Sequence, residues 1–175
     1  MALREIVTDF AELYDASAEE KSVCLDVVVI GEPAAIGDKE LLASATANLV
    51  DNALKYAGDG ANVRLKAIKE EASVAIVVED NGPGIPREER QKVLTRFYRV
   101  DRSRSLPGNG LGPSIVKAIC QLHGGTLALG DAMPGLTVRM SLPAGDTKTT
   151  PNVRVMKELA APSNRAPVAT SIRPT

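Results

Sequence analysis

In the first half of the chain, the spacing of apolar residues changes from a helical period to the patterns of two β-strands. Across residues 39–56, apolar residues return every three or four positions, which predicts an amphipathic helix with Asp38 as its N-cap. Residues 63–68 alternate apolar and polar, and residues 74–79 are almost continuously apolar, which predicts a half-buried strand and a more deeply buried one. A helix followed by two such strands predicts helices packed on a sheet. The helix residues expected to face the core are Leu42, Ala45, Leu49 and Ala53.

The flanking segments extend this pattern into an α/β (α+β) two-layer sandwich. Residues 3–21 have helical periodicity, and we expect the apolar side of this helix to face a partner surface outside the chain. The other predicted elements are a strand at 23–30, a short helix at 87–94, a helix at 113–122, and strands at 126–129 and 136–142. The sequence therefore predicts a five-stranded mixed sheet packed on about three helices.

Composition excludes several classes of protein. A net charge of −1 and an aromatic content of 3% give no signature of nucleic-acid binding. No apolar run approaches the length of a membrane span and no leader opens the chain, so we expect a cytoplasmic segment without membrane contact. Cys24 and Cys120 lie in apolar runs and are expected to be buried, reduced thiols. The single histidine, His123, excludes a histidine-rich metal centre.

The predicted helix at 39–56 carries a polar stripe. Asn48, Asn52 and Lys55 are spaced by four and three residues, which places them on one side of the helix. Carboxamide oxygens suit a hydrated divalent cation that is shared with phosphates, and a lysine can neutralise phosphate charge. Taken alone, the stripe is better explained as a solvated helix face.

Two glycine-containing loops are further candidates for a binding site. Asp80 follows a buried strand and can accept a hydrogen bond from an exocyclic amine, while Gly82 and Gly84 allow close approach of a flat ligand. Residues 108–112 precede a helix, whose first N–H groups can bind phosphate. This second loop is neither a dinucleotide fingerprint nor a P-loop. A tight turn and a surface loop are the respective alternatives.

Four motifs in this order resemble the N, G1, F and G2 boxes of sensor histidine kinases, which share a wider family with gyrase-type ATPases and heat-shock chaperones. They read Asn48-Leu-Val-Asp-Asn52-Ala-Leu-Lys55-Tyr56, Asp80-Asn-Gly82-Pro-Gly84, Arg96-Phe97-Tyr98-Arg99 and Gly108-Asn-Gly110-Leu-Gly112. The resemblance covers roughly residues 23–143. It implies an ATP-binding catalytic domain with a flexible ATP lid at residues 95–112.

The resemblance implies a role for each matching residue around the nucleotide. Asp80 would bind the adenine amino group, and Gly82, Gly84 and Ile85 would shape the base pocket. The adjacent segment 122–125 looks like the usual helix-to-strand ending of the family, so His123 is expected to be structural.

On the phosphate side, the resemblance implies that Asn48 and Asn52 hold Mg²⁺ against the triphosphate. Lys55 would contact phosphate, Tyr56 would contact the nucleotide pocket, and Arg99 would approach the terminal phosphate during transfer. Asn48, Lys55 and Arg99 are therefore the predicted catalytic residues.

The lid residues complete the implied nucleotide site. Phe97 would anchor the lid, while Gly108, Gly110, Leu111 and Gly112 would give it mobility and supply backbone donors to the nucleotide.

One position distinguishes a kinase from an ATPase. Related ATPases and serine kinases carry a glutamate where this chain has Asn48, and an amide cannot take a proton from a nucleophile. A histidine nucleophile needs less help, because a neutral imidazole already has a lone pair. We therefore expect transfer of the ATP γ-phosphate to a histidine on a dimerisation domain, in cis in a longer protein or in trans, and onward to a response regulator. The chain alone is not expected to autophosphorylate.

Two alternatives remain open at this point. Pro113 stands where the family commonly has an apolar residue such as leucine, and it deletes one N–H group that should face phosphate. A catalytically weakened, ATP-binding regulatory module that acts on a partner is therefore the second hypothesis, and a stand-alone ATPase is the third.

The resemblance also divides the chain into three parts. Residues 1–21 are expected to be a residual helix of the dimerisation hairpin, residues 22–145 the catalytic domain, and residues 146–175 a disordered, proline-containing tail. Such a domain can also be the cytosolic part of a membrane-anchored sensor.

Overall fold

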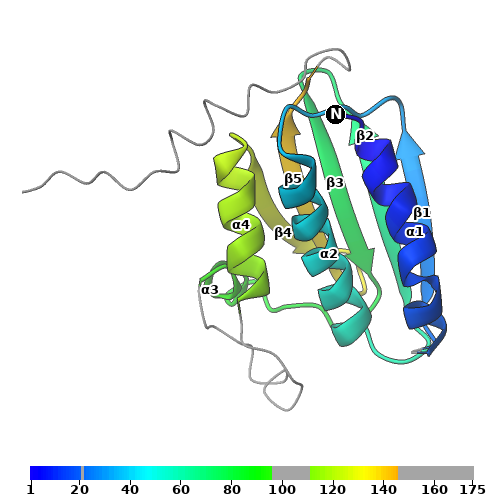
Figure 1. The fold of residues 1–175 in the computed structure, drawn as a ribbon. Coiled ribbons are helices and arrows are strands. Elements are labelled where there is room, and N and C mark those ends of the chain that lie inside the picture. The colour runs from blue at the N-terminus through cyan, green and yellow to red at the C-terminus, as the bar shows by residue number, and fades with distance from the viewer. Residues whose placement is uncertain (21, 96–110, 146–175) are drawn as a thin grey trace, which may run out of the picture.

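A sheet forms one layer of the fold, and helices cover one of its faces (Figure 1). The computed structural model describes residues 1–20, 22–95 and 111–145. Over these residues the strands are β1 (Cys24–Ile30), β2 (Asn62–Lys69), β3 (Ser73–Asp80), β4 (Thr126–Asp131) and β5 (Leu136–Pro143). Their order is β1-β2-β3-β5-β4, with β1 parallel to β2 and every other pair antiparallel. The predicted five-stranded mixed sheet is confirmed.

Three long helices, α1 (Leu3–Glu20), α2 (Lys39–Tyr56) and α4 (Gly112–Leu122), lie on the same side of the sheet (Figure 1). The helix predicted at 39–56 is confirmed at both ends, and Asp38 Oδ1 accepts hydrogen bonds from the N–H groups of Glu40 (2.9 Å) and Leu41 (3.1 Å). The helix predicted at 87–94 is wrong in length. Only α3 (Arg90–Val93) is helical, because Glu89 N–H bonds to Pro86 O in a turn that precedes it.

The continuous apolar run of β3 follows from its central place in the sheet. Val74, Ile76 and Val78 belong to the core under the helices. Val77 points to the opposite face and is still buried, because its neighbours in the sheet are the long side chains of Lys66 on β2 and Arg139 on β5.

Helix α1 shares its core with the rest of the sandwich. Leu3, Ile6 and Val7 are buried, and α1 packs against β1, β2 and α2. The expectation that the apolar side of this helix faces a partner outside the chain is therefore wrong. The physical reason is that α2 and α4 leave the β1 end of the sheet uncovered, and α1 fills that place (Figure 1).

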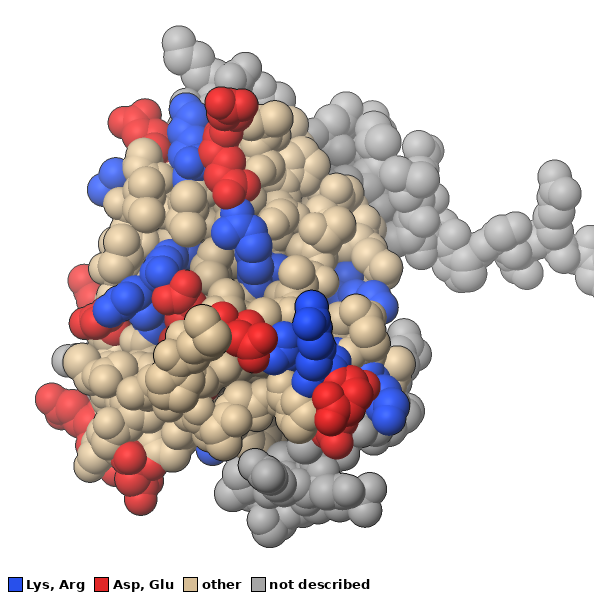
Figure 2. All heavy atoms as spheres, turned by 180° about the vertical axis from the view of Figure 1, so that it is seen from behind, with Lys and Arg blue, Asp and Glu red and all other residues tan. Residues whose placement is uncertain are grey.

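The uncovered face of the sheet carries interspersed charges of both signs (Figure 2). Cys24 lies on this face and is exposed, so its predicted burial is wrong; β1 is an edge strand, and Cys24 points away from the helices. Cys120 is buried as predicted, and burial raises the pKa of its thiol to about 12. In the described parts of the chain, no helix has the length and apolar character needed to cross a membrane.

His123 has a structural role, as the sequence predicted. The buried ring lies at the end of α4, where Nε2 accepts a hydrogen bond from Asp38 N–H at 3.0 Å. The other ring nitrogen, Nδ1, lies 2.8 Å from Ile119 O and donates to it. One side chain thereby joins the last turn of α4 to the N-cap of α2.

Candidate functional site

Asp80 is the last residue of β3, and backbone donors hold its side chain in place. Oδ1 accepts a hydrogen bond from Gly82 N–H at 2.9 Å, and the carboxylate also accepts one from the backbone of Leu136 at the start of β5. Burial raises the pKa of the Asp80 carboxyl, against the smaller opposite effect of these two hydrogen bonds. The result is a half-buried acceptor with a defined orientation, which suits an amino group of a ligand.

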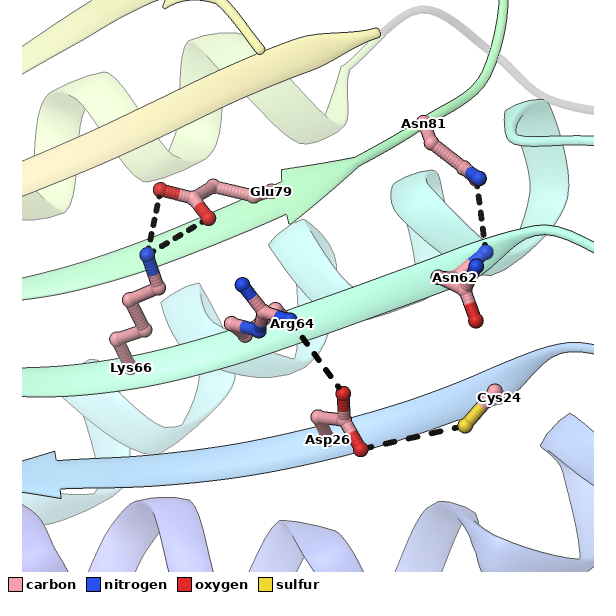
Figure 3. A network of polar contacts seen from close by, with 7 residues as sticks. All are labelled: Cys24, Asp26, Asn62, Arg64, Lys66, Glu79 and Asn81. Carbon is pink, nitrogen blue, oxygen red and sulfur yellow. Dashed lines mark hydrogen bonds and ion pairs between the residues drawn. The ribbon is translucent and has the colours of Figure 1, made fainter. Parts of the chain in front are cut away.

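Asn81 anchors the end of this strand, although sequence reasoning did not single it out. Its N–H donates to Asn62 O at 3.2 Å, and its Oδ1 accepts from Asn62 N–H at 2.7 Å (Figure 3). On the uncovered face of the sheet, Lys66 pairs with Glu79 at 2.7 Å (Figure 3). The turn preference of Asn was the signal that could have identified this anchor.

Close backbone contacts explain two glycines of the loop after Asp80. A Cβ on Gly82 would lie 2.6 Å from Ala57 Cα, so this loop rests on the residue that follows α2. Gly84 has a φ of +67°, and a Cβ there would lie 3.0 Å from Gly135 O. Both predicted loop glycines therefore occupy positions where a side chain does not fit without movement.

The turn between β4 and β5 packs against the same loop. A Cβ on Gly135, whose φ is +109°, would lie 1.7 Å from Asp80 O. The sequence predicted strands at 126–129 and 136–142 but did not assign the connection between them to a site. Only the pairing of β3 with β5 places this turn beside Asp80.

The second candidate region lies where α2 meets the start of α4. A Cβ on Gly112 would lie 3.2 Å from Asn52 Nδ2 and 3.3 Å from Asn48 Oδ1. Asn48 Nδ2 donates to Ser44 O at 2.9 Å, so its oxygen is the end nearer to Gly112. The fold brings together Asn48, Asn52 and Gly112, which the sequence assigned to one site. Two half-buried amides beside a helix start can bind a hydrated cation and an anion together.

The first turn of α4 offers backbone donors. Leu111 is the N-cap, and its apolar side chain cannot accept from the first N–H groups of the helix. Pro113 lies in this first turn, as expected, and has no N–H to offer. The start of α4 therefore has one backbone donor fewer than a helix start of ordinary sequence.

Lys55 and Tyr56 form the last turn of α2, just before Ala57. Lys55 Nζ lies 5.0 Å from the centroid of the Tyr56 ring, and both side chains are half-buried. Four other predicted residues, Phe97, Arg99, Gly108 and Gly110, lie outside the described residues. Within residues 1–20, 22–95 and 111–145, no group of three or more His, Cys, Asp or Glu could hold a metal ion.

A pocket of about 480 Å³ is lined in part by the loop that follows Asp80. Its walls are residues 82–87, Arg90, Asp131 and residues 133–135. Gly82, Gly84 and Ile85 of the predicted base pocket are among these walls, whereas Asp80, Asn48 and Asn52 are not, so the pocket overlaps only part of the predicted nucleotide site. Arg90 is a further residue that sequence reasoning missed, because it lies in the predicted short helix at 87–94, for which no role was inferred.

The family model of histidine kinase-, DNA gyrase B-, and HSP90-like ATPases matches residues 37–146. The chain is 40% identical over 146 residues to the signal transduction histidine-protein kinase/phosphatase MprB of Mycolicibacterium smegmatis, covering 77% of this chain and 30% of the relative. It is 42% identical over 133 residues to MprB of Mycobacterium tuberculosis, covering 73% and 26%. The chain therefore spans less than a third of the length of these curated relatives.

Solved structures show the same similarity in three dimensions. A structure of the mycobacterial sensor histidine kinase MprB superposes with a TM-score of 0.75 at 32% identity, covering 82% of this chain and 97% of that chain. The ATP binding domain of PrrB from Mycobacterium tuberculosis superposes with a TM-score of 0.67 at 28% identity, covering 83% and 96%.

Proposed function

This chain belongs to the family of histidine kinase-, DNA gyrase B- and HSP90-like ATPases, and on that premise we propose that it is the ATP-binding catalytic part of a two-component sensor histidine kinase. Its reaction is transfer of the ATP γ-phosphate to a histidine on a dimerisation domain, from which a response regulator receives it. The observation that carries this proposal is the joint placement of the Asp80 loop at one end of α2 and of two amides beside the start of α4.

The Asp80 loop binds the adenine base. The Asp80 carboxylate accepts a hydrogen bond from the exocyclic amine, and a base without that amine forgoes this hydrogen bond to a half-buried acceptor. Gly82 and Gly84 let the main chain lie close to the flat ring, and Ile85 provides an apolar contact. Discrimination between adenine and other bases therefore comes from Asp80.

The α2–α4 region binds the triphosphate. Asn48 and Asn52 supply neutral oxygens of the kind that Mg²⁺ accepts when it keeps several waters and shares the phosphates. When bound, Mg²⁺ neutralises the charge that develops on the transferred phosphoryl group. Lys55, the N–H groups at Gly112 and the predicted lid residue Arg99 complete the phosphate contacts, and Tyr56 contacts the nucleotide pocket. In this proposal the predicted lid residues Phe97, Gly108 and Gly110 also contribute to nucleotide binding.

The nucleophile in this proposal is a histidine of a dimerisation domain, to which residues 1–21 connect. Asn48 cannot act as a general base, and a neutral imidazole does not require one. Positioning and electrostatics therefore supply most of the catalysis. The reaction takes place in the cytoplasm, where ATP and a response regulator are available.

A second candidate function is regulation of a partner by ATP occupancy without phosphoryl transfer. Pro113 favours it, because the proline removes one donor from the first turn of α4. This second function predicts nucleotide binding without any phosphorylated product.

The test has two steps. First, calorimetric titration with ATP, with and without Mg²⁺, is expected to show Mg²⁺-dependent binding that is lost in Asp80→Asn. Asp26→Asn is the matched control, because Asp26 lies on the uncovered face of the sheet in an exposed ion pair with Arg64. Equal binding by wild type and Asp80→Asn would contradict the assigned base site.

Second, the chain is mixed with a histidine-bearing dimerisation domain of a sensor histidine kinase and labelled ATP. Acid-labile phosphohistidine on that domain is the expected product. Intact binding with no transfer to any such domain would favour the regulatory function, and ATP hydrolysis abolished by Asp80→Asn would favour a stand-alone ATPase.

A further inference from the structure

Arg90 differs from Arg64 on the uncovered face of the sheet in its burial and in its partners. Its side chain is 12% exposed, Nε donates to Ile85 O at 3.0 Å, and the guanidinium pairs with Asp131. By contrast, the Arg64–Asp26 pair is 52% and 53% exposed, with its charged atoms 3.7 Å apart. A surface pair of that kind contributes little. Arg90 instead binds a main-chain carbonyl and a carboxylate from two separate segments.

The two partners of Arg90 belong to the two segments that hold Asp80. Ile85 lies in the loop that starts at Asp80, and Asp131 is the last residue of β4, just before the turn to β5. After that turn, Leu136 donates its backbone hydrogen bond to the Asp80 carboxylate. The contacts therefore form a closed ring from Asp80 through the loop to Ile85, across Arg90 to Asp131, and through the turn back to Asp80.

We propose that Arg90 is a positioning residue for nucleotide binding, which fixes the adenine pocket by tying the loop after Asp80 to the β4–β5 turn. This inference rests on the proposed function, because it assumes that the base binds at Asp80. Arg90 does not contact the ligand in this proposal. It acts through the loop that does.

The chemistry of arginine suits this task. A guanidinium has five N–H donors in a rigid fork and remains charged, so it can serve a carbonyl and a carboxylate at the same time. The Arg90 guanidinium also holds the pKa of the Asp131 carboxyl below its usual range, which keeps the pair ionised in mildly acidic solution. A lysine can keep the charge but not the forked geometry.

The effect on binding should be confined to the base. If Arg90 no longer joins the loop to the β4–β5 turn, the loop must become ordered each time a nucleotide binds. The free-energy cost of this ordering is the same whether the ligand carries three phosphates or none. Selectivity for adenine over guanine should also fall, because it depends on the orientation of the Asp80 acceptor. A residue that only stabilised the fold would leave this selectivity unchanged.

The experiment measures dissociation constants of ATP, ADP, adenosine and GTP for wild type, Arg90→Ala and Arg90→Lys. Arg64→Ala is the matched control, because it removes the same charge from the uncovered face. We expect Arg90→Ala to weaken ATP, ADP and adenosine by the same factor of about ten, with a smaller ratio of ATP to GTP affinity. Arg90→Lys should fall between, and Arg64→Ala should match wild type.

Several outcomes would overturn this inference while leaving the proposed function intact. One is a loss that grows with the number of phosphates, since Arg90 would then act through its charge on the phosphates. Another is binding by Arg90→Ala that equals the Arg64→Ala control. Failure of wild type to bind ATP would instead contradict the proposed function.

A second variant covers the case in which Arg90→Ala does not fold, and a double variant tests whether the two residues act together where Arg90→Ala does fold. Asp131→Asn keeps the arginine and its bond to Ile85 but removes the ion pair, and we expect it to weaken adenosine binding in the same direction. In the double variant Arg90→Ala/Asp131→Asn, the loss should be no larger than in Arg90→Ala alone. Additive losses would show that the two residues act separately.

Discussion

The base side and the phosphate side of the proposed site are built in different ways. On the base side, main chain meets main chain: Gly82 lies against Ala57, Gly84 against Gly135, and Gly135 against Asp80. On the phosphate side, the contacts of Gly112 are the amide ends of Asn48 and Asn52. Backbone cannot move without disturbing its neighbours, whereas the end of a side chain can rotate away.

This difference separates stability from binding. Changes on the base side that add atoms should cost folding free energy and binding together, because the loop is part of the packed structure. Changes on the phosphate side should alter nucleotide binding with little effect on folding. The following variants test this contrast.

The largest expected effect is that of Gly135→Ala. Its Cβ would lie 1.7 Å from Asp80 O at a φ of +109°, so we expect a loss of more than about 2 kcal/mol in the free energy of unfolding. Denaturant unfolding measures this loss, and ATP binding should weaken with it. The control is Gly130→Ala on the same hairpin, where the nearest atom would be 3.9 Å away; equal losses in the two variants would contradict the argument.

On the base side, Asp80→Asn should weaken ATP binding without lowering the stability of the fold. We expect at least a tenfold loss of ATP affinity, about 1.4 kcal/mol or more, with an unfolding midpoint at pH 7 equal to or above that of wild type. The pKa of Asp80 is raised in the folded state, so the folded protein holds this proton more tightly than the unfolded chain. Wild-type stability from this group therefore falls as the pH rises through the folded pKa.

The expected decrease in wild-type stability with rising pH can be tested with Asp80→Asn. Unfolding midpoints of wild type and variant are compared from pH 4 to pH 7. The advantage of the variant should grow toward pH 7. An advantage that shrinks over this interval would mean that the hydrogen bonds from Gly82 and Leu136 outweigh burial.

Gly112→Ala should have an intermediate effect, confined to the phosphate side. The added Cβ would lie 3.2 Å and 3.3 Å from two amide ends, which can rotate, and alanine favours the helix by up to about 1 kcal/mol. We expect an unchanged or higher unfolding midpoint and roughly threefold weaker binding of Mg²⁺–ATP. Without Mg²⁺, the difference in ATP affinity between Gly112→Ala and wild type should be smaller. A loss of stability as large as that of Gly135→Ala would contradict the contrast between the base side and the phosphate side.

The smallest expected effect is a gain in Pro113→Leu. Leucine restores an N–H group in the first turn of α4, where a phosphate can accept from it. We expect about twofold tighter ATP binding or faster phosphoryl transfer. Identical affinity and rate in both proteins would exclude a role for the missing donor.

Local patterns were enough to predict much of the fold. The period of residues 39–56 and the cap at Asp38 determined α2 at both ends, since helix start signals act within one turn. The alternation in β2 and the apolar run of β3 gave the strands, and the motifs placed Asn48, Asn52, Asp80 and Gly112 in one site. Each of these inferences used residues that lie close together in the sequence or in an ordered set of motifs.

The errors and omissions concern residues whose role depends on distant segments. Nothing near Cys24 indicates that β1 is an edge strand whose outer face has no cover, and nothing near residues 3–20 indicates which sheet they cover. Arg90 has the sequence context of a solvated charge, yet its partners are Ile85 and Asp131.

Residue types and their spacing thus specified most of the helices and strands, and the family resemblance suggested the ligand chemistry that we propose for Asp80 and the two amides. The contacts that hold Asp80 and its loop in place depend on the order of the strands in the sheet. Pairing of β3 with β5 sets Gly135 and Leu136 beside Asp80, and pairing of β5 with β4 brings Asp131 to Arg90. These contacts join residues about 40 to 55 positions apart in the sequence. No local sequence pattern encodes such a contact, because the two residues meet only after the sheet has formed.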